Sequence, residues 1–233
     1  GIHSDGFRDN AEQETIRAYA NLGYRHNNGE TRLHLTVQDN HLELPGALRL
    51  SQLLEDPTQA NGFWQRNGAE RDFQRYRLAL QHDRAAWGGE LSVATWFEEQ
   101  ELDHPLPFVV IDNDDYHYGA GLRFNRDFDS GVSWVWGLLT AFEDVDGRQF
   151  APAGGGRKGD LRQTSDSEAY NLEAYTELRY PLASEVSLVA GAQGVIAQRE
   201  TQIDRSNRVF TDDEQTYHAF NPKLGLLWDL NSG

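Results

Sequence analysis

The stretch "EAYNLEAYTELRYPLASEVSLVAGAQ", residues Glu168 to Gln193, alternates apolar and polar side chains. One series of alternate residues consists of Tyr170, Leu172, Ala174, Thr176, Leu178 and Tyr180, and the other consists of Asn171, Glu173, Tyr175, Glu177 and Arg179. Successive side chains of a β-strand point to opposite faces of its sheet. This period of two therefore predicts a strand with one apolar face and one polar face.

The same alternation recurs along the chain and predicts nine strands. The expected strands are residues 15–26, 31–42, 72–83, 88–100, 116–125, 131–143, 168–180, 186–198 and 217–230. Their connections alternate between short and long, and the turn at Asn28-Gly29 is a typical hairpin turn. Antiparallel strands place alternate connections at opposite ends of a sheet. The pattern therefore predicts a sheet with tight turns at one end and long loops at the other, as in outer-membrane β-barrels.

Aromatic residues gather near the ends of the expected strands, on their apolar faces. They are Tyr24, Phe97, Tyr116, Tyr118, Phe124, Trp134, Phe142, Tyr170, Tyr180, Phe220 and Trp228. Transmembrane barrels carry two such aromatic girdles at the membrane interfaces. We therefore expect an all-β, antiparallel, up-and-down transmembrane barrel segment whose apolar face contacts the lipid bilayer, with short periplasmic turns and long extracellular loops.

Composition narrows the classes of function. The net charge of −16 disfavours nucleic acid as a partner, because binding phosphates requires clustered basic residues. Cysteine is absent, which excludes disulfides and thiolate metal sites. No run approaches the roughly 18 apolar residues of a membrane helix. The chain begins "GIHSDGFRDN", without an initiator methionine, so we expect a processed or excised segment.

Four short motifs resemble the barrel region of TonB-dependent outer-membrane receptors. They are "SDGFRDNAEQET", "LELPGAL" with "EDPTQA", "EAYTELRYPL…LVAGAQ" and "FNPKLGLLWDL". The resemblance implies a barrel of about 22 strands with a plugged lumen. It also implies a location in the bacterial outer membrane and uptake of a ferric siderophore or similar scarce nutrient. An N-terminal motif would engage the TonB energy-transducing complex. We expect residues 1–233 to be a partial β-barrel domain, without the plug and the remaining strands.

Basic residues stand out in so acidic a chain and are the candidates for binding an anionic iron chelate. Arginine can grip carboxylate or catecholate oxygens with two parallel hydrogen bonds. The candidates are Arg66, Arg71, Arg75, Arg77, Arg123, Arg148, Arg157 and Lys158, with Trp64 as an aromatic contact for the ligand. The alternative is that arginines in the lumen pair with carboxylates such as Glu173 and Glu177.

One acidic motif and one glycine-rich motif are candidates for binding a metal ion and a dinucleotide, respectively. The run "IDNDDYHY" offers Asp112, Asp114 and Asp115 as weak metal candidates, although it lacks the spacing of a calcium-binding EF-hand loop. The run "GGGRKG", residues 154–159, matches a dinucleotide-binding pattern but has no strand before it and no helix after it. We expect a solvated acidic loop and a flexible loop, and neither a cofactor nor a catalytic residue.

Three alternatives remain open at this point. A passive porin-like barrel would have no plug, and an enzymatic outer-membrane barrel would hold a nucleophile and a base close together. A soluble β-sandwich binding protein would bury its apolar face in a core. Such a protein would fold without detergent.

Overall fold

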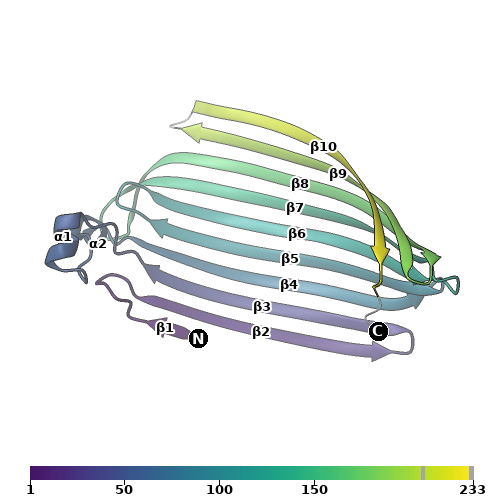
Figure 1. Cartoon of the computed structure of the whole chain (residues 1–233). Coiled ribbons are helices and arrows are strands. Elements are labelled where there is room, and N and C mark those ends of the chain that lie inside the picture. The colour runs from purple at the N-terminus through teal and green to yellow at the C-terminus, as the bar shows by residue number, and fades with distance from the viewer. Residues whose placement is uncertain (206–207, 231–233) are drawn as a thin grey trace.

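The computed structural model describes residues 1–205 and 208–230 and contains one antiparallel sheet with two short helices. Its elements are β1 (Ile2–Ser4), β2 (Gln13–His26), β3 (Gly29–Glu43), α1 (Leu50–Glu55), α2 (Gly62–Arg66), β4 (Glu70–Ala86), β5 (Gly89–Pro105), β6 (Val110–Asp127), β7 (Ser133–Pro152), β8 (Lys158–Ala183), β9 (Val186–Arg205) and β10 (Arg208–Trp228). The strands lie in the order β1 to β10, so each pairs with its neighbours in sequence (Figure 1). This is the predicted up-and-down topology.

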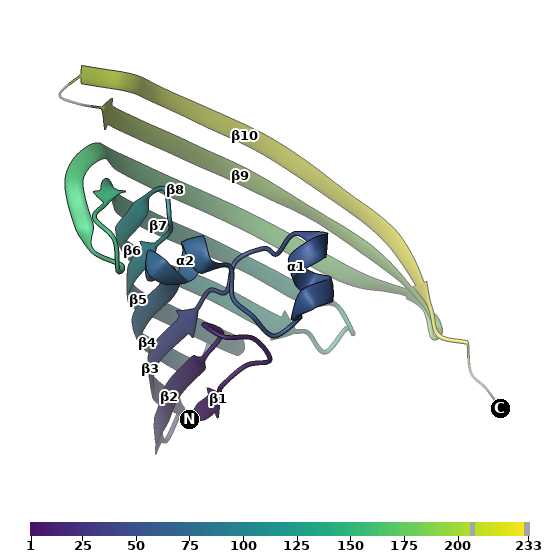
Figure 2. The ribbon, with the colours of Figure 1, turned by 90° about the vertical axis from the view of Figure 1, so that its left-hand side faces the viewer.

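The sheet is bent into an arc, and α1 and α2 lie on its concave side (Figure 2). Register places Leu35 opposite Leu78, and Leu78 opposite Phe97. We call the face with these residues the apolar face and the face with Arg75 the polar face. In a barrel wall the convex side meets lipid and the concave side lines the lumen. Because lipid is apolar and the lumen holds water, we assign the apolar face to the convex, outer side.

Little hydrophobic surface is buried within the described residues, where the buried apolar side chains are Ala60, Ala69, Val110, Phe124 and Val189. On the apolar face, Leu35, Leu78 and Leu138 remain 41%, 45% and 43% exposed. No second layer of described residues covers this face. A soluble sandwich would bury these side chains in its core, so this arrangement favours the membrane barrel.

Aromatic rings form two groups on the apolar face. Tyr118, Phe142 and Tyr170 lie in a row across β6, β7 and β8, with ring centroids 5.1 Å and 4.9 Å apart. Towards the tight turns, Phe124 lies 6.2 Å from Trp134 and 5.9 Å from Trp136. These two rows lie at the positions expected of interfacial girdles.

The structure differs from the sequence prediction in the number and length of the strands. The described residues form ten strands rather than nine, because Ile2–Ser4 pairs with Gln13–Thr15 as the edge strand β1. The strands also continue towards the loop end: β8 has 26 residues, and only residues 153–157 separate it from β7. The added strand segments carry polar side chains on both faces. They therefore lack the alternation by which strands were recognised.

One long loop, residues 44–69, carries both helices. Its two ends meet where Leu44 N donates to Ala69 O at 2.9 Å, and Asn61 caps α2 by accepting a hydrogen bond from Phe63 N at 2.9 Å. Among the described residues, neither helix has the length and apolar character needed to cross a membrane.

Two glycines on the polar face accommodate aromatic rings from neighbouring strands. A Cβ atom on Gly119 would lie 2.4 Å from both Thr140 O and the Trp96 ring, and one on Gly137 would lie 2.5 Å from the Tyr175 ring. Gly194, on the apolar face, has open space at the same position. The polar face is therefore locally close-packed although it faces the lumen.

We predict that Gly119→Ala lowers the free energy of unfolding by about 1–3 kcal/mol, because its methyl group would overlap a backbone oxygen and an indole ring. Gly194→Ala is the matched control, and a change within about 0.5 kcal/mol is expected there. Urea unfolding of both variants in detergent measures the difference. Equal stability of the two variants would contradict this packing.

Candidate functional site

The predicted basic residues divide between the two faces and the loops. Arg71, Arg75 and Arg77 lie on the polar face of β4, and Arg123 lies on the polar face of β6. Trp64 and Arg66 belong to α2, and Arg157 lies in the connection between β7 and β8. Arg148 is instead on the outer side of β7, in register with Asp112, and Lys158 pairs with the same carboxylate. The structure therefore does not bring the predicted group together as one surface.

A polar network runs across β4, β5 and β6 on the polar face. The Glu98 carboxylate forms ion pairs with Arg75 at 3.3 Å and with Arg77 at 3.8 Å, so one carboxylate binds two guanidinium groups. Arg75 also donates to Gln100 Oε1 at 2.7 Å, and Gln100 donates to Asp115 Oδ2 at 3.0 Å. The arginines are thus held in place by lumen carboxylates and amides, as the pairing alternative predicted.

Glu173 and Glu177, which were expected to pair with arginines of the lumen, bind other side chains. Glu173 accepts a hydrogen bond from Gln193 at 2.6 Å, and Glu177 pairs with Lys223 at 2.6 Å. Arg123 has no ion pair and no side-chain hydrogen bond among residues 1–205 and 208–230. Among the described residues Arg71 likewise has no ion pair or side-chain hydrogen bond and lies over the Phe73 ring, so Arg71 and Arg123 are the polar-face candidates most available to an incoming anion.

Three loops pack against one another at the end of the sheet opposite the tight turns. The Trp64 ring meets Phe108 edge to face, with centroids 6.4 Å apart, and leaves no room for a side chain at Gly46. Gly156 N donates to Asn67 O at 2.7 Å. The 44–69 loop is therefore anchored to the connections at 106–109 and 153–157, and it places Trp64 at the mouth of the lumen side.

The glycine-rich motif is a turn between antiparallel strands, and the prediction that no strand precedes it is wrong because β7 ends at Pro152. Gly154, Gly155 and Gly156 all have positive φ, and Ala153 N donates to Arg157 O at 2.9 Å. No helix follows, so its glycines serve a tight reversal between β7 and β8 rather than a nucleotide cradle.

The acidic metal candidates lie in strand β6 and not in the solvated loop that the sequence predicted, and the alternation of the strand separates them. Asp112 and Asp114 lie on the outer side, where Arg148 contacts both carboxylates at 3.7 Å and 2.5 Å. Lys158 lies 2.8 Å from Asp112 and 3.4 Å from Asp103. Asp115 points to the polar face, where it binds Gln100. These three aspartates therefore do not converge on one ion, and two of them are already neutralised by basic residues.

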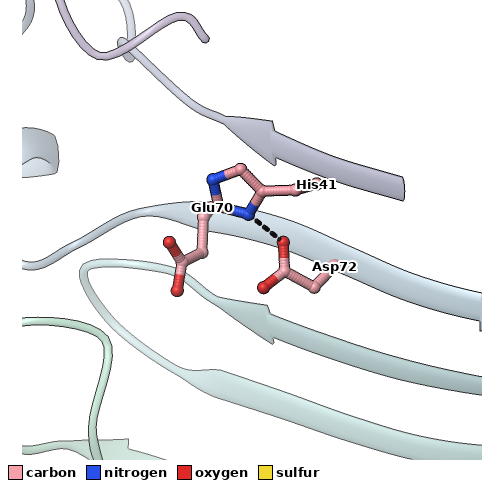
Figure 3. Close-up of side chains that lie close together, drawn as sticks. All are labelled: His41, Glu70 and Asp72. Carbon is pink, nitrogen blue, oxygen red and sulfur yellow. Dashed lines mark hydrogen bonds and ion pairs between the residues drawn. The ribbon is translucent and has the colours of Figure 1, made fainter. Parts of the chain in front are cut away.

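Sequence reasoning missed a second acidic cluster, made of His41, Glu70 and Asp72 (Figure 3). His41 Nδ1 lies 2.6 Å from Asp72 Oδ1. Burial alone would lower the pKa of His41, but the hydrogen bond to Asp72 and the carboxylates of Asp72, Glu70 and Glu43 raise it. Partial burial, followed by the charges of Asp72 and Asp103, raises the pKa of Glu70. Finding the cluster requires the strand register that places residue 41 opposite residue 72, and the sequence alone does not provide that register.

Comparison with known proteins shows which protein family this chain is similar to. A family model described as the β-barrel of TonB-dependent receptor-like proteins matches residues 5–233. A search of curated proteins gives no match. The family consists of transport receptors of the bacterial outer membrane rather than enzymes, which confirms the predicted fold, family and location.

Solved structures of three receptors share the fold. The unliganded ferric citrate transporter FecA superposes with a TM-score of 0.83 at 13% identity, over 97% of this chain and 35% of that chain. The alcaligin receptor FauA of Bordetella pertussis gives 0.71 at 15% identity, over 95% and 34%. The ferric yersiniabactin receptor FyuA of Yersinia pestis gives 0.68 at 11% identity, over 95% and 36%. The chain therefore spans about a third of the length of these receptors.

We predict that Asp72→Asn lowers the pKa of His41, because it removes the carboxylate that hydrogen-bonds to the ring. With the raised pKa, His41 stabilises the fold below about pH 6.5, and this contribution is lost as the pH rises through the folded-state pKa. NMR titration of the histidine ring, with His218 as the reference signal, measures the change. An unchanged His41 titration in the variant would contradict the ion pair.

Proposed function

Because the chain belongs to the family of TonB-dependent receptor-like β-barrels, we propose that it is part of the wall of a receptor that takes up a ferric siderophore or a similar scarce nutrient. The observation that carries the proposal is the family match over residues 5–233, together with a sheet that has one apolar and one polar face. Transport is energised through TonB, whose binding motif would belong to a region outside this chain.

The proposed domain organisation follows from the edges of the sheet. Within the described residues, β10 pairs only with β9, and β2 pairs on its outer edge only with the three residues of β1. Unpaired backbone groups are costly in hydrocarbon, so further strands must close the barrel. We place residues 1–233 in the barrel domain of the intact receptor and assign the plug to another segment.

The proposed ligand surface combines the polar face with the packed loops. Its residues are Arg71, Arg75, Arg77 and Arg123 on the sheet and Trp64, Arg66 and Arg157 in the loops. Arg75 and Arg77 share Glu98, so an anionic chelate would compete with this carboxylate for two preorganised guanidinium groups. Arg148 and Lys158 are left out because they pair with carboxylates on the outer side.

A passive pore is the main competing function, and dependence on TonB separates the two. We predict that cells producing the intact receptor grow on at least one ferric chelate under iron limitation, and that disruption of tonB abolishes this growth. A panel containing ferric citrate and ferric catecholates, with radioactive iron uptake as the readout, tests it. Uptake that persists without TonB would indicate passive diffusion.

We also predict that replacing both Arg75 and Arg77 by Ala weakens binding of the transported anionic chelate by at least about 100-fold, since the two charge-assisted hydrogen bonds that are lost contribute roughly 1.5–3 kcal/mol each. Replacing both Arg148 and Lys158 by Ala removes the same two charges from the outer side and is expected to leave binding unchanged. Titration of the purified intact receptor with the chelate that supports growth measures both effects. Equal losses in the two variants would show that the polar face does not contact the ligand.

A further inference from the structure

The side chains of His41, Glu70 and Asp72 meet at the loop end of β3 and β4, on the outer side of the sheet. His41 is in register with Asp72, and Glu43 is in register with Glu70. His41 lies four residues beyond Val37 on the same face, which is about 13 Å along the strand. The cluster is therefore beyond the apolar band and faces the aqueous side.

The three side chains present their donor atoms to a common point. One imidazole nitrogen and one oxygen from each carboxylate all lie within 4.8 Å of one another. Figure 3 shows both carboxylates beside the His41 ring, with Asp72 bound to Nδ1. The Glu70 carboxylate has no hydrogen bond and no ion pair among residues 1–205 and 208–230. The Glu70 carboxylate is thus free to bind a metal ion.

Negative charge around the cluster exceeds the basic groups that oppose it. Asp103 is in register with Asp72, and the charges of Asp103 and Glu43 both act on Glu70. Lys158 reaches Asp103 at 3.4 Å but lies closer to Asp112, at 2.8 Å. Carboxylates directly opposite one another in a sheet destabilise it. A divalent cation would offset this repulsion.

We propose that His41, Glu70 and Asp72 form a binding site for a divalent transition-metal ion, with Zn²⁺ as the representative ion. Three protein ligands of nitrogen and oxygen type, with a remaining position for water, suit Zn²⁺. The imidazole distinguishes such ions from Ca²⁺ and Mg²⁺, which take oxygen ligands. The ion replaces the hydrogen bond between His41 and Asp72, and a proton leaves to solvent when the imidazole was protonated.

Binding requires a small movement of side chains. Metal–ligand distances of about 2.0–2.2 Å in a tetrahedron separate two ligand atoms by about 3.4 Å. The 2.6 Å separation of His41 Nδ1 and Asp72 Oδ1 must therefore widen, while Glu70 moves inwards. Both shifts are rotations of partly exposed side chains and leave the strand pairing intact.

The ion at this site is not transported cargo, because the cluster lies on the face opposite to Arg75 and the lumen. It would instead join β3 to β4 just below the point where the 44–69 loop begins and ends, at the bond between Leu44 and Ala69. The proposed role is to clamp the base of the loop that carries Trp64.

The test is a titration of the metal-free intact receptor with Zn²⁺, by calorimetry in detergent. We expect His41→Ala, Glu70→Gln and Asp72→Asn each to weaken binding at this site by at least about tenfold. His218→Ala and Glu200→Gln, which change the same residue types on the same face but on the distant strands β10 and β9, are the controls and should bind as the unaltered receptor does. An excess of Ca²⁺ should not displace the ion.

Cu²⁺ gives a second readout that needs no loss of stability to interpret. Electron paramagnetic resonance of the unaltered receptor with one equivalent of Cu²⁺ should show coupling to one imidazole nitrogen, and His41→Gln should remove it. Zn²⁺ binding that is unchanged in all three variants, or a Cu²⁺ spectrum without nitrogen coupling, would overturn the proposal. Either result leaves the TonB-dependent uptake unaffected, so the two proposals fail separately.

Discussion

Backbone hydrogen bonding in an environment without water is the constraint on which this structure depends. Hydrocarbon offers no partner for an N–H or C=O group, so each strand must pair along both edges. From β3 to β9 the chain meets this demand by pairing every strand with both of its neighbours in sequence. This up-and-down pairing also determines where each side chain lies, because side chains alternate along a strand between the lipid and the lumen.

The two faces treat charge differently. On the polar face, arginines and carboxylates form shared networks such as Arg75, Glu98 and Arg77, which hold cationic groups in fixed positions. On the outer side, charge appears beyond the two aromatic groups, as at Asp112 and Asp114 towards the loops and at Arg84 and Arg126 towards the tight turns. The neighbours Asp114 and Asp115 illustrate the division: one pairs with Arg148 outside, and the other accepts from Gln100 inside.

The loop end combines the features that bear on ligand binding and on the proposed metal site. Trp64 packs against Phe108, and the 44–69 loop is tied to the connection at 153–157 by the hydrogen bond between Gly156 and Asn67. The His41, Glu70 and Asp72 cluster lies at the root of the same loop. A metal clamp on the outside and a ligand surface on the inside would therefore act on one structural unit from opposite faces.

Local alternation determined the strand type, the two faces and the aromatic girdles, because a period of two is written in adjacent residues such as Leu33, Leu35 and Val37. It failed where both faces are polar, as in the extensions of β7 and β8, and it did not show β1. Only the tertiary structure decided which residues meet. His41 and Asp72 are 31 residues apart, and their contact depends on the register of β3 and β4 across the 44–69 loop. Register is set by pairing over the whole sheet, so no local pattern specifies it.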